Sequence, residues 1–367
     1  MSAISVYRPP ESVWWEYISG PSRLVRETVN LLQSGISVCI CTHNNFPFRD
    51  TFFQQVANKI RETEHSLLLD DVILATGDPG ILLIDRFGLK SEYRESIKPT
   101  DFLLKRRALA NYLIPVVAVG DDVDMWLDFI NSYQAGSIVD GLFILEVNTD
   151  SRVREFKKIQ TIRYTDFVTD YDALLFAGLI TDDNLSNTST KRYVTAMVTS
   201  FFGGDAEGIT SFINQYQTTR EPIDCLPENV LPIDNLKYRL WNAQVQELFP
   251  LIMRETHDII RMWRTQFDEA FEYIEDSRYY LNSLFPDGLR KMNHEAIESP
   301  NDLELASIYF LMRKKRRDKS GNDTLDYVLF IPDINVRERI ELLYNMRNSI
   351  AHGRVCPIDE VMRLLNP

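Results

Sequence analysis

Short apolar runs alternate with helical patterns through the first half of the chain, and this alternation restricts the fold more than any other feature. The intervening segments Ser22–Gln33, Asp50–Thr63 and Asp124–Tyr133 carry apolar residues at helical spacing. Strands that alternate with helices predict an α/β layer with a mostly parallel sheet, and uninterrupted apolar strands are typical of a sheet covered on both faces. The predicted strands are Ser37–Cys41, Val72–Ala75, Ile114–Val119, Leu142–Val147 and, as a further candidate, Leu174–Leu179.

The second half of the chain is helical in pattern. The polar run Thr181–Thr190 predicts an exposed loop or a boundary. Beyond it, the long helical pattern Tyr238–Tyr280 is expected to break or bend near Pro250. A last long helix is expected after Pro332, with Asn335 as its N-cap. We therefore expect an α/β domain over residues 1–182, a helical connector over 183–234 and an all-helical bundle over 235–367.

The chain is acidic, with 40 basic and 53 acidic residues and a net charge of −13. Nucleic acid repels such a chain on average, so any contact with RNA must be local. The one dense basic run is Arg313–Lys319. Two interpretations stay open: a phosphate-binding loop, or a solvated helix end whose cations are favoured by the helix dipole. The candidate RNA-binding residues are Arg313, Lys314, Lys315, Arg316 and Arg317.

Neither a membrane span nor a structural metal is expected. No stretch of about 18 uncharged apolar residues occurs, and the N-terminus lacks a basic segment followed by an apolar one, so we expect no signal peptide and a cytoplasmic location. The four cysteines and five histidines show no zinc-site spacing. Cys39 and Cys41 alternate along a predicted strand and are expected to be small core residues.

Near the end of the chain, the segment Met346–Gly353 reads Met-Arg-Asn-Ser-Ile-Ala-His-Gly. Arg347 is followed by the polar Asn348, and four residues separate Arg347 from His352. This spacing resembles the signature of the HEPN superfamily. The resemblance covers about the last 130 residues and implies an up-and-down helical bundle, metal-independent endoribonuclease activity on RNA, and two motifs that meet across a homodimer.

The chemistry of the HEPN-like motif can be stated from its residue types. Arg347 can hold a phosphate with two donors, and His352 titrates near neutrality at a helix end that favours its protonated form, as a general acid needs. Asn348 can orient the substrate by hydrogen bonds. Five residues of separation place Arg347 and His352 about 140° apart on a helix, so one helix does not easily direct both side chains to one point. A distorted helix end or a second subunit would help. The alternative is structural: Arg347 pairs with an acidic residue and His352 caps carbonyl groups.

The N-terminal half resembles, in its order of elements, the entry of an AAA- or STAND-type P-loop ATPase core. Gly20-Pro21, a helix and the strand Ser37–Cys41 lead into the loop Thr42–Asp50. A phosphate cradle needs glycines and a Lys-Ser/Thr pair at the helix start, and this loop has neither glycine nor lysine. Arg49 is the residue that could replace the lysine as a charge, and Leu142–Glu146 loosely resembles a Walker B strand. We therefore expect a degenerate ATPase-like scaffold without ATP hydrolysis and without a cofactor.

Three functions are open from the sequence. The first is a HEPN endoribonuclease effector of a bacterial defence or stress system, which would cleave RNA with Arg347, Asn348 and His352. Its N-terminal domain would control this activity. The second is a non-catalytic adaptor or assembly subunit of a multi-protein defence complex, which an inert ATPase-like half and an acidic surface suit. The third is a nucleotide sensor that uses the α/β domain without hydrolysis. Separately, His43 in the loop after the first strand is either a ligand-binding residue or a structural or exposed histidine.

Overall fold

In a computed structural model, the chain forms two compact units. Unit 1 comprises Met1–Asn184 and Phe202–Arg220, and unit 2 comprises Leu185–Phe201 and Glu221–Pro367. The expected connector over 183–234 thus contributes residues to both units. The described residues are 8–42, 46–133, 140–148, 153–181, 188–219, 233–272, 303–317, 320, 322–327, 329 and 331–366.

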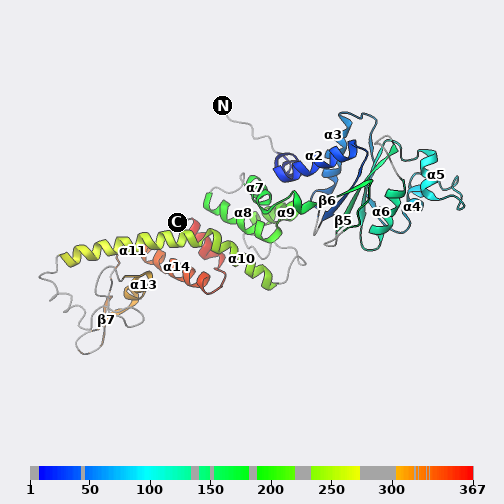
Figure 1. Cartoon of the computed structure of the whole chain (residues 1–367). Helices are drawn as coiled ribbons and strands as arrows, with labels where there is room; N and C mark the ends of the chain where they lie inside the picture. The colour runs from blue at the N-terminus through cyan, green and yellow to red at the C-terminus, as the bar shows by residue number, and fades with distance from the viewer. Residues whose placement is uncertain are drawn as a thin grey trace. The chain divides into compact units, whose positions relative to one another are not determined.

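Unit 1 is built on a parallel sheet, as the sequence predicts (Figure 1). The strand order is β2-β4-β5-β1-β6, and β3 also pairs with β4. Every pairing in this sheet is parallel. In the register of the two central strands, Ile40 lies opposite Glu146. The strands are β1 (Ser37–Thr42), β2 (Leu68–Leu69), β3 (Ile73–Leu74), β4 (Tyr112–Ala118), β5 (Leu142–Asn148) and β6 (Ile159–Arg163).

Helices cover both faces of the sheet, because its central strands are apolar on both sides. Figure 1 shows α2 and α3 on one face and α6 on the other. The ring of Phe143 in β5 packs against Trp126 and Phe129 of α6. The helical segments of unit 1 are α1 (Pro10–Ser12), η1 (Val13–Tyr17), α2 (Ser19–Gln33), α3 (Arg49–Arg61), α4 (Pro79–Arg86), α5 (Pro99–Arg106), α6 (Asp122–Tyr133), η3 (Tyr164–Asp166), α7 (Asp170–Ile180) and α9 (Ala206–Thr219).

The candidate strand Leu174–Leu179 is wrong, because this segment lies inside helix α7. Thr169 starts the helix with a capping box: its hydroxyl accepts from the Asp172 N–H, and the Asp172 carboxylate accepts from the Thr169 N–H. A short apolar run does not by itself distinguish a strand from a helix, and the capping box decides here.

Unit 2 is mainly helical, and its elements agree with the predicted break near Pro250. The helix α10 ends at Glu247 and α11 begins at Phe249. The last long helix, α14, begins one residue after Asp333, whose side chain accepts from the Asn335 N–H at 2.8 Å, so Asp333 and not Asn335 is the N-cap. The elements are α8 (Thr188–Phe202, its last residue in unit 1), α10 (Ile233–Glu247), α11 (Phe249–Glu272), α13 (Leu305–Arg313), β7 (Lys315–Arg317), β8 (Asp323–Tyr327), α14 (Ile334–Ala351) and α15 (Ile358–Leu365).

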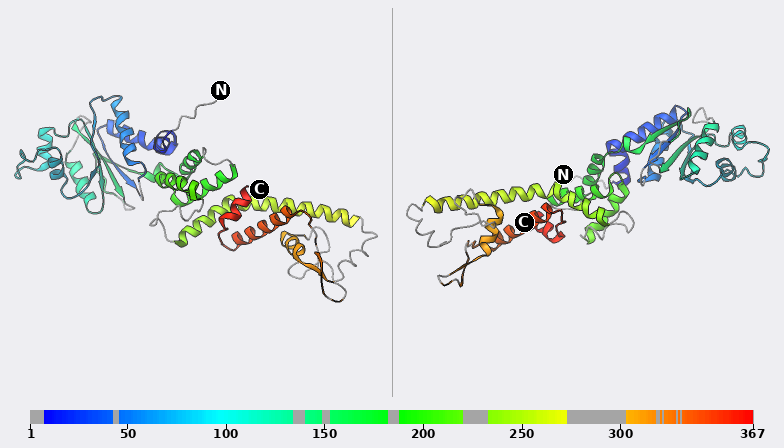
Figure 2. Two further views of the ribbon diagram at one scale, coloured as in Figure 1. Left: turned by 180° about the vertical axis from the view of Figure 1, so that it is seen from behind. Right: turned by 60° about the horizontal axis from the view of Figure 1, so that its bottom comes forward.

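Helix α14 packs against α10, α11, α13 and α15, and it lies beside α11 in both views of Figure 2. The guanidinium of Arg339 donates to both carboxylate oxygens of Glu255 at 2.8 Å and to two carbonyl groups of α15. The buried amide of Gln244 accepts from the Cys356 N–H at 2.8 Å and donates to the Cys356 carbonyl at 3.1 Å. These contacts fix a helical unit, whereas a HEPN bundle stays a prediction.

Candidate functional site

A ligand of such a sheet is expected where the carboxyl ends of β1 and β5 meet, and we call this place the ligand crevice. From β1 the chain crosses to β2 at one edge, and from β5 it continues to β6 on the other side of β1. Connections that leave adjacent parallel strands in opposite directions open a crevice, and open α/β sheets bind their ligands there. Thr42 ends β1, Glu146 lies in β5, and Arg49 is the first residue of α3. The structure thus brings Arg49 and the carboxylate of the Walker-B-like run to one place.

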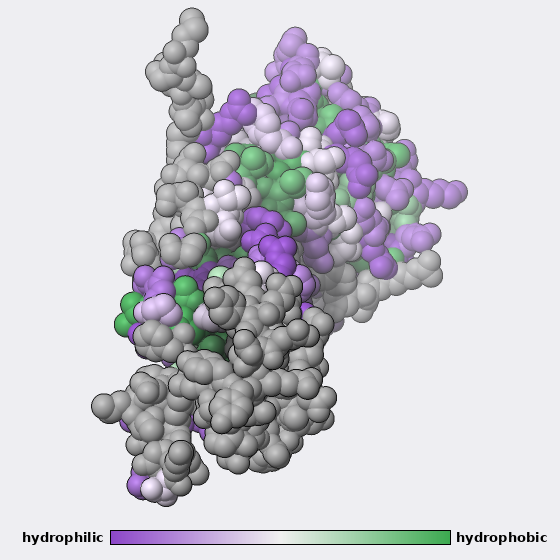
Figure 3. Space-filling view, turned by 90° about the vertical axis from the view of Figure 1, so that its left-hand side faces the viewer, coloured by the Kyte–Doolittle hydropathy of each residue, from purple (hydrophilic) through white to green (hydrophobic). Residues whose placement is uncertain are grey.

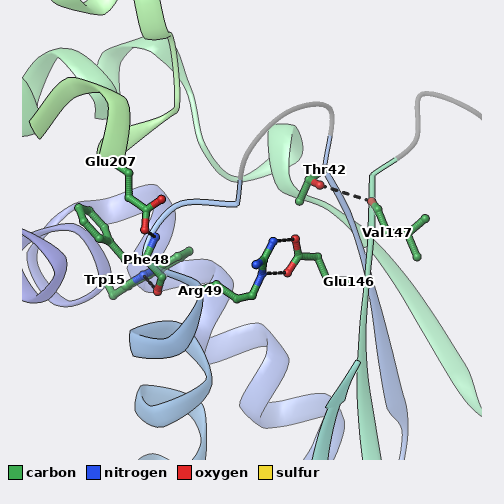
Figure 4. Close-up of polar contacts among 7 residues, drawn as sticks. All are labelled: Trp15, Thr42, Phe48, Arg49, Glu146, Val147 and Glu207. Carbon is green, nitrogen blue, oxygen red and sulfur yellow. Dashed lines mark hydrogen bonds and ion pairs between the residues drawn. The ribbon is translucent and has the colours of Figure 1, made fainter. Parts of the chain in front are cut away.

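Arg49 and Glu146 form a bidentate ion pair in this crevice (Figure 4). Nε of Arg49 lies 2.5 Å from Oε2 of Glu146, and Nη2 lies 2.7 Å from Oε1. The side chain of Glu146 is 4% exposed and that of Arg49 is 35% exposed. Both carboxylate oxygens are therefore occupied by one guanidinium, the arrangement that a buried carboxylate needs.

Burial falls mainly on Glu146, so the pKa values of the two partners are raised by different causes. Burial raises the pKa of Glu146, although the hydrogen bond from Arg49 acts in the opposite direction. The hydrogen bond to Glu146 raises the pKa of Arg49. The different exposures explain both pKa shifts. The Glu146 carboxylate has lost nearly all its water, whereas the Arg49 guanidinium keeps part of its own.

The described end of the loop between β1 and α3 is held by the protein's own groups. Phe48 is left-handed, with φ of 49°. Its N–H donates to Oε1 of Glu207 in α9 at 2.8 Å, and its carbonyl accepts from Nε1 of Trp15 at 3.2 Å (Figure 4). The ring of Phe46 packs against those of Trp15 and Phe52. A helix N-terminus offers backbone N–H groups to anions, and here the one just before α3 already serves a carboxylate.

Two donors that could face a phosphate are therefore satisfied internally: the Phe48 N–H by Glu207, and the Arg49 guanidinium by Glu146. Thr42 at the end of β1 donates its hydroxyl to the Val147 carbonyl at 3.4 Å. His43 lies outside the described residues. Within the described ranges, no group of three His, Cys, Asp or Glu side chains could hold a metal ion.

The HEPN-like motif lies at the end of α14. Arg347 and Asn348 are half-buried, and His352 is exposed at the C-cap, where its N–H donates to the Asn348 carbonyl at 3.0 Å. Over the part of unit 2 that the structure describes, the side chains of Arg347 and His352 make no hydrogen bond or ion pair. The helix continues to Ala351, which keeps the two side chains about 140° apart. Within one protomer, α14 does not direct them to the same point.

The basic run follows α13 into a hairpin. Arg313 ends α13, donates to the Tyr309 hydroxyl and pairs with Glu341 at 3.2 Å. Lys314 and Lys315 are exposed, and β7 pairs antiparallel with β8. The expected helix end is thus correct only for Arg313, because residues 315–317 form a strand.

Beside Arg313, a shallow pocket is lined by two arginines and two glutamates. Its lining therefore offers no surplus positive charge to a phosphate. Tyr344 of α14, one turn before Arg347, stacks on Tyr309 with ring centroids 4.0 Å apart. The pocket-lining residues are Met312, Arg313, Ile334, Arg337, Glu338 and Glu341.

Comparisons with known proteins leave the family open. No family model and no curated protein sequence matches the chain. A chain in the structure of Drosophila ORC bound to GC-rich DNA and Cdc6 is 10% identical with a TM-score of 0.30, over 65% of this chain and 46% of that one. Rhizobiales Trip13 is 9% identical with a TM-score of 0.31, over 62% and 84% of the two chains. This chain spans less than half of that ORC chain. Similarities at these scores carry no argument about function.

Among the described residues, no helix is long and apolar enough to cross a membrane.

Proposed function

We propose that the chain is a non-catalytic adaptor or assembly subunit whose α/β unit is an ATPase-like scaffold that does not use nucleotide. The observation that carries the proposal is the bidentate pair of Arg49 and the buried Glu146 in the ligand crevice. In an ATPase, a cation at this helix start would face phosphate and a strand-end carboxylate would serve Mg²⁺ or water. Here the two groups neutralise each other.

Displacing this pair is costly. If a phosphate bound Arg49 in place of Glu146, the Glu146 side chain, which is 4% exposed, would become an unpaired buried carboxylate. Removing one partner of a fully buried ion pair costs about 3–5 kcal/mol, and about 2 kcal/mol here because Arg49 is 35% exposed. The negative phosphate would add repulsion. The Phe48 N–H would also have to leave Glu207. Internal carboxylates thus satisfy two of the described donors that could face a nucleotide, the Phe48 N–H and the Arg49 guanidinium.

Isothermal titration calorimetry of the full chain with MgATP and MgADP tests this proposal. We expect no saturable heat at millimolar nucleotide, for the wild type and for the control Arg86→Ala. Arg86 makes an equivalent bidentate pair with Asp70 away from the crevice, at 2.7 and 2.9 Å. Saturable binding of MgATP by the wild type, weakened in Arg49→Ala and unchanged in Arg86→Ala, would overturn the proposal.

A second candidate is the HEPN-type endoribonuclease, with Arg347 holding the scissile phosphate, Asn348 orienting it and His352 moving protons across a homodimer. It is supported by the exposure of His352 and by the unpaired state of Arg347 among the described residues. The basic run from Arg313 to Arg317 would then guide the RNA.

This candidate predicts RNA cleavage in EDTA that is lost in Arg347→Ala and His352→Ala. The matched controls are Arg354→Ala and His257→Ala, which change exposed residues of the same unit. Equal cleavage by all four variants, or no cleavage by the wild type, rejects the nuclease.

A further inference from the structure

Helix α7 presents an apolar ridge to solvent. We define the α7 ridge as four large apolar side chains whose positions in the sequence follow helical spacing. Their exposed fractions are far above those of core residues. The ridge consists of Tyr171 (66% exposed), Leu174 (39%), Leu175 (41%) and Leu179 (51%).

The opposite face of α7 is already used. Ala173, Phe176 and Ala177 are fully buried, and the ring of Phe176 contacts that of Trp14 at 5.1 Å. The carboxylate of Asp172 accepts from the Gly20 N–H at 3.0 Å and anchors the helix to α2. A helix at a protein surface normally turns polar residues outwards. Because α7 buries one face and keeps a second apolar face exposed, its sequence is not explained by the core of unit 1.

Scattered exposed apolar residues are ordinary, but a contiguous stripe marks an interaction site. Figure 3 shows hydrophobic side chains scattered among hydrophilic ones on the face of the molecule that it draws. The α7 ridge differs from isolated cases such as Leu74 because its four members share one helix face over about 12 Å.

The ridge has a shape that suits another helix. Tyr171, Leu175 and Leu179 follow one another at intervals of four residues, which is the row that interdigitates when two helices pack. Beside this row lies Gly178, where an added Cβ would meet nothing within 4 Å. The glycine leaves a notch next to Leu174 and Leu175. A large apolar side chain of a second helix fits such a notch.

The charges around the ridge define the partner further. From Tyr164 to Thr190 the chain contains no Lys, Arg or His. In the described part of this segment, Asp166 and Asp170 are exposed, whereas Asp172 is buried and bonded within unit 1. A second copy of α7 packed in parallel would bring the two Asp170 carboxylates together, and like charges oppose that pairing. A helix with basic residues beside its apolar face would be attracted.

We propose that the α7 ridge docks an amphipathic helix of a partner protein whose apolar face is flanked by lysines or arginines. The inference rests on the adaptor function, since it names the surface through which that function would act. It does not depend on the state of the nucleotide crevice, so the two proposals fail in different experiments.

The test uses the full chain and two fluorescently labelled synthetic peptides. One is an amphipathic helix of leucine and lysine, and the other has glutamate at every lysine position. Fluorescence anisotropy at two salt concentrations measures binding. The test variant is Leu175→Ser with Leu179→Ser. The control is Leu68→Ser with Leu74→Ser, which removes two leucines of the same unit that are 49% and 69% exposed.

We expect saturable binding of the leucine–lysine peptide, at least about tenfold weaker in the test variant and unchanged in the control, which corresponds to about 1.4 kcal/mol. Binding should weaken with salt, and the glutamate peptide should not bind. No binding of the lysine peptide, equal loss in both variants, or equal binding of both peptides overturns the proposal. A wild-type dimer in sedimentation that becomes monomeric in the test variant would also overturn it, by assigning the ridge to self-association.

Circular dichroism of both variants checks that the fold persists. Should the double serine variant unfold, Gly178→Phe serves in its place. This change fills the notch without removing an existing contact, and the same tenfold loss is expected.

Discussion

Arg49→Ala tests the central ion pair, because Arg49 is the only partner of the buried Glu146 carboxylate among the residues that the structure describes. Breaking a fully buried pair costs about 3–5 kcal/mol. Arg49 keeps 35% of its side chain exposed, so water can reach the vacated space. We therefore expect the free energy of unfolding of unit 1 to fall by about 2 kcal/mol, below the range for a fully buried pair.

Glu146→Gln should cost less than Arg49→Ala. The amide has the same shape as the carboxylate, its oxygen still accepts from Arg49, and no charge remains buried. The arginine is left half-exposed and can be solvated. We expect a loss below about 1 kcal/mol. As a control, Arg154→Ala breaks a pair with Asp128 whose side chains are 60% and 54% exposed, which should change stability little.

The effect of Arg49→Ala should depend on pH in a defined direction. Burial raises the pKa of Glu146 in the folded state, and loss of Arg49 removes the contact that opposes this shift. A raised carboxyl pKa contributes stability that is present below the unfolded pKa and lost as pH rises through the folded one. The variant should therefore be closer to wild type at about pH 5 than at about pH 8.

Urea unfolding followed by tryptophan fluorescence measures these differences, and hydrogen exchange of β1 and β5 peptides assigns the transition to unit 1. A loss for Glu146→Gln equal to or larger than that for Arg49→Ala would refute the reasoning. So would a penalty for Arg49→Ala that grows towards acid pH.

Three further substitutions test the packing. Gly20→Ala should lower the melting temperature of unit 1, because the new Cβ would lie 2.3 Å from the Phe167 carbonyl oxygen, a cost of about 1–3 kcal/mol; an unchanged melting temperature would contradict this. Arg339→Ala should destabilise unit 2 by about 2–3 kcal/mol in urea unfolding, whereas Arg261→Ala, whose side chain is 74% exposed, should have no measurable effect. Gln244→Leu should cost about 2–3 kcal/mol by leaving the Cys356 N–H and carbonyl unpaired, with the exposed Gln246→Leu as control; calorimetry that finds equal effects would reject this role.

The central strands could be predicted from the sequence because they are uninterrupted apolar runs. The observed β1, β4 and β5 differ from the predicted bounds by two residues or fewer. Strand β6 was not predicted, because Gln160 and Arg163 interrupt its apolar residues at the sheet edge. The run Leu174–Leu179 resembles a strand in sequence because it is apolar on both its buried and its exposed face, as is a strand that is covered on both sides.

The residues of the crevice could be noticed, but their arrangement could not. Arg49 stood out as a replacement for a lysine, and Glu146 as a carboxylate after an apolar strand. Their pairing depends on a contact across 97 residues, and the Phe48–Glu207 contact spans 159 residues. No local sequence pattern predicts contacts between residues so far apart along the chain. Nothing in the sequence therefore indicated that Glu207 and Trp15 contact the loop. For Arg347 and His352, the helix geometry predicted from their spacing agrees with α14.

Hydrogen exchange of the Phe46–Phe52 peptide, with and without millimolar MgATP, tests most directly whether the crevice is closed by the protein's own carboxylates. The Phe48 N–H donates to the Glu207 carboxylate, and the Arg49 guanidinium donates to the Glu146 carboxylate. The account predicts the same exchange rate in both conditions, since a ligand that does not bind gives no protection. Slower exchange of this peptide in MgATP, absent from peptides of α6, would contradict it.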